Sequence, residues 1–181
     1  MRPDPANATA AAGDVSATPD GTYTVMMVCL GNICRSPMAA AVLRARLAEA
    51  GLDDRIEVRS SGTGSWHVGA AADHRAAATL AKAGYDTTHT ARQFDPEEAR
   101  DVDLILAMDS ENLADLRFVL GPDDRLRMLR SFDPTLAGVP EGSQLDVPDP
   151  YYGGADGFRE VLSMIERAVD GLLATMPPPR Q

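Results

Sequence analysis

The chain has 181 residues, of which 44% are hydrophobic and 24% charged, which excludes a wholly disordered chain, a collagen-like fibre and a disulfide scaffold. Its 27 Asp and Glu residues exceed its 17 Lys and Arg residues, and the net charge of −10 argues against nucleic acid or an anionic membrane as a partner. The two cysteines, Cys29 and Cys34, are too few for a cysteine-stapled fold or, alone, a structural zinc site. Free thiols in a reducing, cytoplasmic compartment are therefore expected.

Both ends of the sequence are predicted to lie outside the folded domain. Residues 1–21 are rich in Ala, Pro, Thr and Asp and should form a disordered tail. They lack the apolar stretch of a secretory signal, so the sequon at Asn7 is expected to be a chance match. Residues 177–181 form a Pro-rich tail, which leaves residues 22–176 as a single domain. Because the sequence has no apolar run of about 18 residues, no membrane span is predicted.

The first predicted element is a strand over residues 23–28, an unbroken apolar run that is typical of a strand buried on both faces. A helix should begin at Ser36-Pro37, with Pro at its first position, and end near Gly51. The remaining strands are predicted at residues 56–58, 104–108 and 126–129. The remaining helices are predicted over an Ala-rich stretch ending near Gly84, from Asp95-Pro96, from Asp109 or Ser110, and along an apolar stripe formed by Phe158, Val161, Leu162, Ile165, Ala168, Val169 and Leu172.

This alternation of strands and helices predicts an α/β fold. We expect a single domain with a four-stranded parallel sheet and helices on both of its faces. Ligands of such sheets bind at the carboxyl ends of the strands. The loop over residues 29–36 follows the first strand directly, and therefore lies at that edge.

The loop over residues 29–36 has the features of an anion-binding site. Backbone N–H groups between a strand and a helix can surround an anion, and the helix N-terminus adds partial positive charge. Arg35 offers a planar fork that matches two phosphate oxygens, and Gly31 lets the backbone bend or approach the anion closely. The loop residues predicted to bind a phosphoryl group besides Arg35 are Leu30, Gly31, Asn32, Ile33, Cys34 and Ser36.

Cys29, at the start of this loop, is the candidate nucleophile. The positive field should favour its thiolate over its thiol, and a thiolate beside a bound phosphoryl group is an activated nucleophile. The alternative is that Cys29 is a buried small hydrophobe. Phosphoryl transfer to sulfur, followed by hydrolysis, needs no metal or cofactor because N–H groups and Arg35 can stabilise the equatorial oxygens. The three histidines also lack the spacing of metal ligands.

An aryl phosphate needs a carboxylic acid over its leaving oxygen, because the phenol pKa is about 10. Asp146 and Asp149 are both candidates for this acid, which would afterwards accept a proton from water. Pro148 and Pro150 restrict the backbone of this segment, as suits a positioned acid.

The segment CLGNICRSP at residues 29–37 resembles the phosphate loop of the low-molecular-weight protein tyrosine phosphatases. The resemblance implies a metal-independent phosphotyrosine protein phosphatase that works through a cysteinyl-phosphate intermediate. It makes Cys29 the nucleophile and Arg35 the phosphate clamp, and it selects Asp149 as the acid. The likeness covers about residues 23–176 and recurs, in the family's order, at residues 58–63, 66–69, 89–93, 108–113 and 149–153.

The resemblance also implies roles for residues around the loop. Trp66, Tyr151 and Tyr152 look like the aromatic walls of the substrate slot, the alternatives being core filling for Trp66 and surface packing for the tyrosines. Cys34 resembles the family's second loop cysteine, which can close a disulfide with the nucleophile after oxidation and so protect it. The residues that match positions bracing the phosphate loop are Asn32, Ser36, Ser60 and His89, with Ser36 also placed to hydrogen-bond the thiolate.

Two features depart from the family's pattern or lack a match in it. Residues 137–143 look like an insertion just before the acid loop, from which they could contact the substrate. His67 and His74 match no family position with a role and are expected at the surface.

Three competing functions use the same scaffold or site. A protein-arginine phosphatase tends to have Thr at the position of Ile33 and lacks the paired tyrosines, so this sequence favours phosphotyrosine. An arsenate reductase needs further cysteines after Cys34, and the sequence has none. A non-catalytic phosphate-binding module would be expected to lose Cys29 or Asp149. The expected partners are a phosphotyrosine protein and a cognate tyrosine kinase, and the protein is expected to be a monomer.

Overall fold

The computed structural model describes residues 21–176. Residues 1–20 and 177–181, which make up nearly all of the two predicted tails, lie outside the described residues, as does the sequon at Asn7. Within residues 21–176, no helix is both long enough and apolar enough to cross a bilayer.

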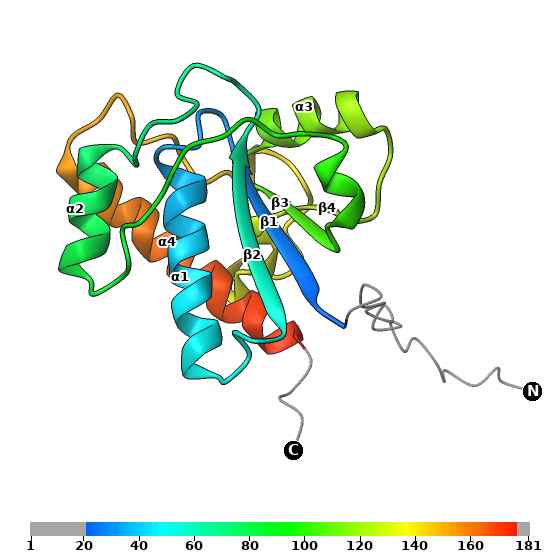
Figure 1. The fold of residues 1–181 in the computed structure, drawn as a ribbon, viewed down its shortest axis with the longest axis horizontal. Coiled ribbons are helices and arrows are strands. Elements are labelled where there is room, and N and C mark those ends of the chain that lie inside the picture. The colour runs from blue at the N-terminus through cyan, green and yellow to red at the C-terminus, as the bar shows by residue number, and fades with distance from the viewer. Residues whose placement is uncertain (1–20, 177–181) are drawn as a thin grey trace, which may run out of the picture.

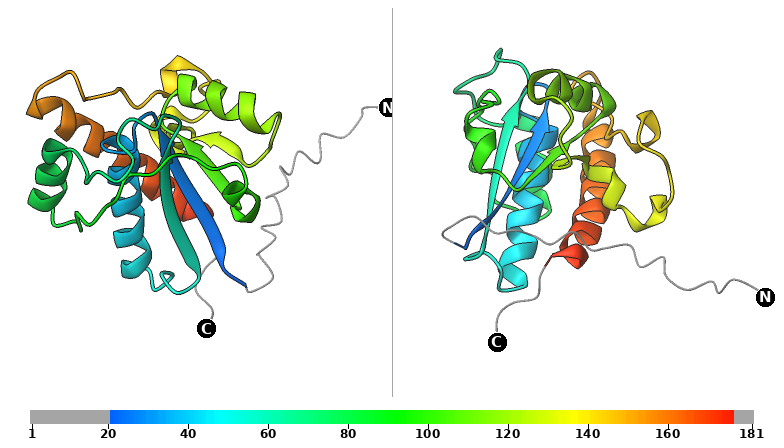
Figure 2. Two further views of the ribbon diagram at one scale, coloured as in Figure 1. Left: turned by 45° about the horizontal axis from the view of Figure 1, so that its top comes forward. Right: turned by 90° about the vertical axis from the view of Figure 1, so that its right-hand side faces the viewer.

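Four parallel strands form one sheet in the order β2-β1-β3-β4 (Figure 1). Helices α1, α2 and α4 pack on one face of this sheet and α3 on the other (Figure 2). The predicted single-domain fold, a parallel sheet with helices on both faces, is therefore confirmed. The strands are β1 (Tyr23–Cys29), β2 (Ile56–Gly62), β3 (Leu104–Ala107) and β4 (Leu126–Met128). The helices are α1 (Arg35–Glu49), α2 (His74–Lys82), α3 (Ser110–Leu120) and α4 (Ala155–Thr175).

The central strand β1 explains the unbroken apolar run in the sequence. Val25 and Met27 pack with α1 and α4, whereas Met26 and Val28 pack with β3 and α3 on the opposite face. All four side chains are fully buried, so neither face of the strand can carry a polar residue without a buried partner.

Strand β2 is longer than the predicted residues 56–58. Its second half contains Ser60 and Ser61, polar side chains that are buried and so do not look like a strand in the sequence. The strand ends at Gly62, opposite Cys29, where a Cβ atom would lie 2.7 Å from the carbonyl oxygen of Leu30. Glycine is needed here because the loop after β1 folds directly over the end of β2.

The α-helix predicted from Asp95-Pro96 is wrong, because the structure has a single 3₁₀ turn there. The Asp95 side chain accepts a hydrogen bond from the backbone N–H of Glu97 at 2.9 Å, as a cap does. The segment then makes only a 3₁₀ turn at Glu98–Asp101, because the chain must become extended at Val102 to enter β3. Three further 3₁₀ turns are described, at Leu129–Phe132, Pro134–Leu136 and Ser143–Leu145.

The carboxyl edge of the sheet gathers the loops that matter for function. The loop between β1 and α1, the loop after β2, the start of α3 and the segment that leads into α4 all meet there, along the upper end of the molecule in Figure 1. Asp109 caps α3 through a capping box with Asn112, which confirms one of the two predicted cap residues.

Candidate active site

The loop between β1 and α1 turns its backbone carbonyl groups away from its centre. The carbonyls of five loop residues each accept a hydrogen bond from elsewhere, at 2.6–3.2 Å; the residues are Cys29, Leu30, Asn32, Ile33 and Cys34. The described peptide bonds contain no cis bond, so the N–H that follows each carbonyl points the opposite way. The loop is therefore a nest of N–H groups, with the N-terminus of α1 adding positive charge. Such a nest can accommodate an anion.

Asn32 holds the shape of this loop from below. It is fully buried and has a φ of 55°, which among the described residues no other non-glycine shares. Its side-chain Nδ2 donates to the hydroxyls of Ser36 at 2.8 Å and Ser60 at 3.1 Å. Its Oδ1 accepts from the backbone N–H of Arg92 at 2.9 Å. These three bonds compensate the strain of the left-handed backbone and tie the loop to β2.

The Cys29 sulfur lies on the floor of the site beside a hydroxyl. Its Sγ is 2.9 Å from the Ser36 Oγ, and both side chains are buried. Ser36 also receives the hydrogen bond from Asn32, and the two acceptors within reach of its own proton are the sulfur at 2.9 Å and the Ser61 carbonyl at 3.4 Å. A hydroxyl in this place stabilises a thiolate.

His89 braces the same loop from the other side. Its Nε2 lies 2.6 Å from the backbone carbonyl oxygen of Asn32, which can only accept. Burial lowers the pKa of His89 below its ordinary value of 6.5. The ring is therefore neutral near pH 7 and donates its Nε2–H to Asn32. Ser36, Ser60 and His89 therefore all contact Asn32.

Arg35 is buried, with only 3% of its side chain exposed. Its Nη1 donates to Asp109 at 2.5 Å and to the Val147 carbonyl at 2.9 Å, and its Nη2 lies 3.7 Å from Asp149. Burial works to lower the pKa of the guanidinium, but Cys29, Asp109 and Asp149 outweigh it and raise the pKa. The fork therefore stays charged, with one nitrogen anchored and the other at the cavity.

Asp109 is the residue of this site to which sequence reasoning gave no role beyond capping α3. Its Oδ2 anchors Arg35, while its Oδ1 accepts from the backbone N–H of Asn112 at 2.7 Å. One carboxylate thus fixes both the Arg35 side chain and the N-terminus of α3. Its position directly after β3 was the available signal, because the carboxyl ends of β1 and β3 adjoin in the sheet.

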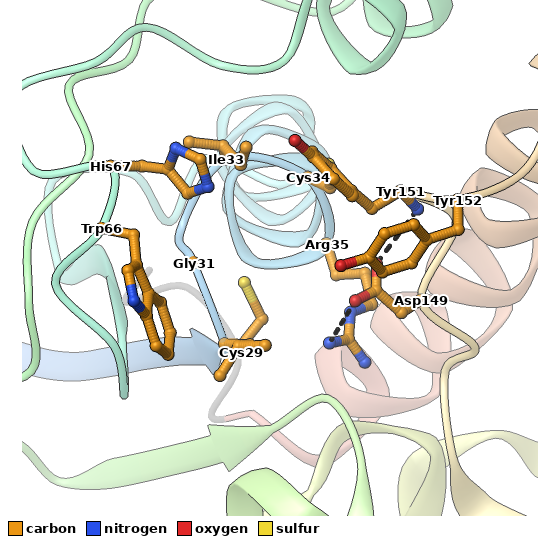
Figure 3. Close-up of a pocket in the computed structure, with 11 residues that line it drawn as sticks. Cys29, Gly31, Ile33, Cys34, Arg35, Trp66, His67, Asp149, Tyr151 and Tyr152 are labelled. Carbon is orange, nitrogen blue, oxygen red and sulfur yellow. Dashed lines mark hydrogen bonds and ion pairs between the residues drawn. The ribbon is translucent and has the colours of Figure 1, made fainter.

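Cys29 forms the floor of a cavity of about 390 Å³. Figure 3 shows the sulfur between Trp66 on one side and Asp149 with Tyr152 on the other, with Arg35 beside it. Ten of the predicted residues line this cavity, namely Cys29, Leu30, Gly31, Ile33, Cys34, Arg35, Trp66, Asp149, Tyr151 and Tyr152. The other four predicted residues, Asn32, Ser36, Ser60 and His89, lie behind the loop.

The two candidate acids have different places in the structure. Asp149 lines the cavity, and its Oδ1 accepts from the backbone N–H of Tyr151 at 3.1 Å. Asp146 does not line the cavity; its Oδ1 accepts from the backbone N–H of Ser110 at 2.7 Å, at the N-terminus of α3. Only Asp149 can reach a group bound above Cys29.

Arg75, which the sequence did not single out, holds the segment after Asp149. It donates to the carbonyls of Tyr151 at 3.0 Å and Gly153 at 3.1 Å. It is itself oriented by Asp73 at 3.0 Å, and its guanidinium lies 5.6 Å from the centre of the Tyr151 ring. The Tyr151 and Tyr152 rings meet edge to face at 5.0 Å. Arg75 therefore links α2 to the aromatic wall.

One expectation about the surroundings of the site is corrected, and a second remains a prediction. His67 is not a plain surface residue: it lines the cavity and packs over Gly31, where a Cβ atom would be 3.0 Å from its ring. No residue of the 137–143 segment lines the cavity. That segment lies beside α3 instead, where Glu141 pairs with Arg117 at 2.6 Å. His74 is exposed, as expected.

Cys34 lines the same cavity, and both cysteines are free thiols in the structure. Burial, together with the negative charges of Asp73, Cys29 and Asp149, raises the pKa of Cys34 to about 12. Cys34 is therefore a thiol near neutral pH. Within residues 21–176, no group of three or more His, Cys, Asp or Glu side chains is arranged to hold a metal ion.

Comparison with known proteins agrees with this geometry. A low molecular weight protein-tyrosine-phosphatase of Streptomyces coelicolor is 52% identical over 159 residues, which cover 86% of this chain and 94% of that protein. A protein tyrosine phosphatase of Entamoeba histolytica, crystallised with Hepes in its active site, matches with a TM-score of 0.76 at 31% identity, over 84% of this chain and 96% of that one. YwlE, an arginine phosphatase of Bacillus subtilis, matches with a TM-score of 0.73 at 25% identity, over 84% and 94% of the two chains.

The family match extends over nearly all of the described structure. Residues 24–180 match the family described as "Low molecular weight phosphotyrosine protein phosphatase". The chain therefore belongs to the low molecular weight protein-tyrosine phosphatases, a family of phosphoric monoester hydrolases.

Proposed function

We propose that the protein hydrolyses phosphotyrosine in proteins without a metal, through a cysteinyl-phosphate intermediate on Cys29. The observation that carries this proposal is the outward direction of the loop carbonyls around a buried Cys29 sulfur. The inward N–H groups and the charged Arg35 supply the positive charge that a metal would otherwise provide.

In the first step the Cys29 thiolate attacks phosphorus and the bond from phosphorus to the tyrosyl oxygen breaks. Asp149 gives its proton to that oxygen, which leaves as a neutral phenol. The Arg35 fork and the N–H nest bind the three equatorial oxygens as their charge grows. Ser36, 2.9 Å from the sulfur, stabilises Cys29 before the attack and again as the leaving group of the second step.

In the second step water attacks phosphorus and the sulfur–phosphorus bond breaks. Asp149, now a carboxylate, takes a proton from the water, and inorganic phosphate leaves with Cys29 restored as a thiolate. Asp149 lines the cavity 3.7 Å from the Nη2 of Arg35, so it acts in both steps beside the group that binds the phosphate.

Phosphotyrosine suits the cavity better than phosphoserine or phosphoarginine. Trp66, Tyr151 and Tyr152 form aromatic walls around an opening of about 390 Å³, which would leave a short phosphoserine with few contacts. Phosphoarginine brings a guanidinium of its own, and the cavity already holds Arg35. Ile33, which also lines the cavity, offers that group an apolar contact and no hydrogen bond.

Hydrolysis of three phosphopeptides that differ only in phosphotyrosine, phosphoserine or phosphoarginine tests the proposal. In the presence of a chelator, the wild type should prefer phosphotyrosine, and Cys29→Ser should lose all turnover. Asp149→Asn should lower kcat on phosphotyrosine by about 10²–10³-fold, and less on 4-nitrophenyl phosphate, whose leaving group needs no proton. Asp146→Asn is the matched control and should keep kcat.

Three results would each overturn a different part of the proposal. A preference for phosphoarginine would contradict the substrate assignment and leave the nucleophile in place. Loss of turnover in chelator, restored by a divalent metal, would contradict metal independence. Phosphate binding without any turnover would make the site a binding module.

The proposal also includes the cellular setting and the second cysteine. We infer a cytoplasmic, monomeric enzyme that opposes a tyrosine kinase, consistent with its free thiols.

After peroxide converts Cys29 to a sulfenic acid, the Cys34 sulfur would displace water and close a disulfide, losing its proton as it does so. Equal recovery of wild type and Cys34→Ser after peroxide and then thiol would contradict this protective role.

A further inference from the structure

A second groove, of about 540 Å³, lies directly beside the catalytic cavity. The two hollows share two walls, Leu30 and Trp66. The rest of the groove comes from the loop after β2, the segment before β3 and the outer face of α3 (Figures 1 and 2). Its apolar lining residues are Leu30, Trp66, Phe94, Pro96, Leu116, Phe118 and Val119.

The exposed apolar side chains of the described residues gather around these two hollows. Seven large hydrophobic residues are exposed, and six of them line the cavity or the groove; the seven are Leu30, Trp66, Val68, Phe118, Val119, Tyr151 and Tyr152. Phe118 is 92% exposed and Val119 52%. Neither is needed to hold α3 on the sheet, because Leu113 and Leu116 do so. Such a patch marks a binding surface.

Trp66 connects the groove to the reaction. Its indole packs against Gly64, where an added Cβ would overlap the ring. The residue lines both hollows, and Figure 3 shows its ring on one side of the Cys29 sulfur. A chain that leaves the cavity past Leu30 and Trp66 therefore enters the groove.

On the basis of the proposed function, we propose that this groove binds an aromatic or large aliphatic side chain of the substrate, near the phosphotyrosine in its sequence. An extended chain advances about 3.3–3.6 Å per residue, so hollows that share walls correspond to positions within about four residues of each other. The one charged residue lining the groove is Asp115, which disfavours acidic side chains there.

The occupant is a substrate segment, because the groove continues the catalytic cavity and does not stand apart from it. A second copy of this chain is the competing occupant. The net charge of −10 opposes self-association through a groove that itself carries Asp115, whereas a short neutral or basic peptide is not opposed.

The test measures kcat/KM on phosphotyrosine peptides in which Leu or Phe replaces Ser at each position within about four residues of the phosphotyrosine. We expect one or two adjacent positions at which the apolar residue raises kcat/KM by about tenfold in the wild type. Phe118→Ser and Val119→Thr should reduce this preference to about threefold or less, with the melting temperature unchanged because both side chains are exposed. Val68→Thr, at an exposed valine outside both hollows, is the matched control and should keep the preference.

Two readouts separate failure of this inference from failure of the proposed function. Turnover of 4-nitrophenyl phosphate, which is too small to reach the groove, should be the same in Phe118→Ser and wild type. If the wild type hydrolyses none of the peptides, the affinities of the same peptides for wild type and for Phe118→Ser test independently whether the groove binds the apolar side chain. No preferred position, or a preference that survives both substitutions, would overturn the inference. Self-association that Phe118→Ser abolishes without changing the peptide preference would assign the groove to a second copy and overturn it as well.

Discussion

The floor and the rim of the catalytic cavity are built in opposite ways. The floor is one continuous segment, residues 29–36, whose side chains other than Leu30 and Gly31 are buried. The rim comes from two loops far apart in the sequence, and its aromatic side chains are exposed, Trp66 by 73% and Tyr152 by 91%. The floor is therefore held in place by packing, whereas the rim side chains are largely exposed to solvent. Substitutions in the floor should damage activity or folding, and substitutions in the rim should change selectivity and rate without unfolding the protein.

Of the substitutions that keep the Cys29 nucleophile, Arg35→Lys should produce the largest effect. A lysine cannot bond Asp109 and the Val147 carbonyl with one nitrogen while presenting another to phosphate, as the buried fork does. We expect kcat/KM on 4-nitrophenyl phosphate to fall by about 10³-fold, measured by steady-state kinetics. Arg127→Lys, an exposed position on β4, is the control and should change little. A fall of less than about tenfold in Arg35→Lys would show that the fork is not the clamp.

Asn32→Ala should destabilise the fold, because Asn32 holds the floor of the cavity in shape. It removes three side-chain hydrogen bonds and puts Ala at a φ of 55°. We expect a loss of about 2–4 kcal/mol in the free energy of unfolding, measured by urea denaturation. Asn32→Gly removes the same bonds, but glycine adopts a positive φ without strain. Its free energy of unfolding should therefore exceed that of Asn32→Ala by about 1 kcal/mol. Equal stability of wild type and Asn32→Ala would contradict the contrast between floor and rim.

These floor residues also show what the sequence can and cannot predict. The strand, the loop, the helix and the Cys29–Arg35 pair are local in sequence, and their roles follow from a strand that leads into a helix N-terminus. Ser60 and His89 were identified only through the family resemblance. Their contacts with Asn32 cross the sheet and no local pattern predicts them.

The rim was only partly predictable for the same physical reason. Asp149 and the two tyrosines lie in one motif, but Arg75, which holds the backbone at Tyr151 and Gly153, comes from α2. The position of His67 was predicted wrongly because its ring packs over Gly31, a contact between two loops that no local pattern predicts. Residues 137–143 precede Asp149 closely in sequence, yet Glu141 pairs with Arg117 on α3 and none of these residues lines the cavity.

Arg75→Lys tests the rim with a smaller expected effect. Without the fork, the bonds to Tyr151 and Gly153 cannot both persist, so the segment after Asp149 loses its position. We expect kcat on a phosphotyrosine peptide to fall about tenfold, and kcat on 4-nitrophenyl phosphate to fall less because that leaving group needs no acid. Arg159→Lys, on the exposed face of α4, should leave both values unchanged. Equal losses on the two substrates, or a lowered melting temperature, would mean that Arg75 is a structural residue of the fold.

The pH dependence of stability should show the smallest effect, through His89. Burial lowers the pKa of His89 in the folded protein. Below about pH 6.5, His89 is therefore protonated in the unfolded chain while it is still neutral in the folded chain. Stability is therefore complete above that pH and falls as the pH drops toward the folded pKa. His89→Gln, which keeps an N–H donor, should weaken this acid sensitivity of the melting temperature, whereas His74→Gln at an exposed site should retain it. An identical pH dependence in wild type and His89→Gln would contradict the assignment.

The central claim is that phosphate passes through the sulfur of Cys29, and rapid-quench mass spectrometry of Asp149→Asn tests it most directly. With 4-nitrophenyl phosphate the first step needs no acid, but the second has lost its base, so the intermediate should accumulate. We predict a burst of 4-nitrophenol equal to the enzyme concentration and a phosphate group on the peptide that contains Cys29. A phosphate on any other residue, or steady turnover with neither burst nor phosphoenzyme, would contradict the account.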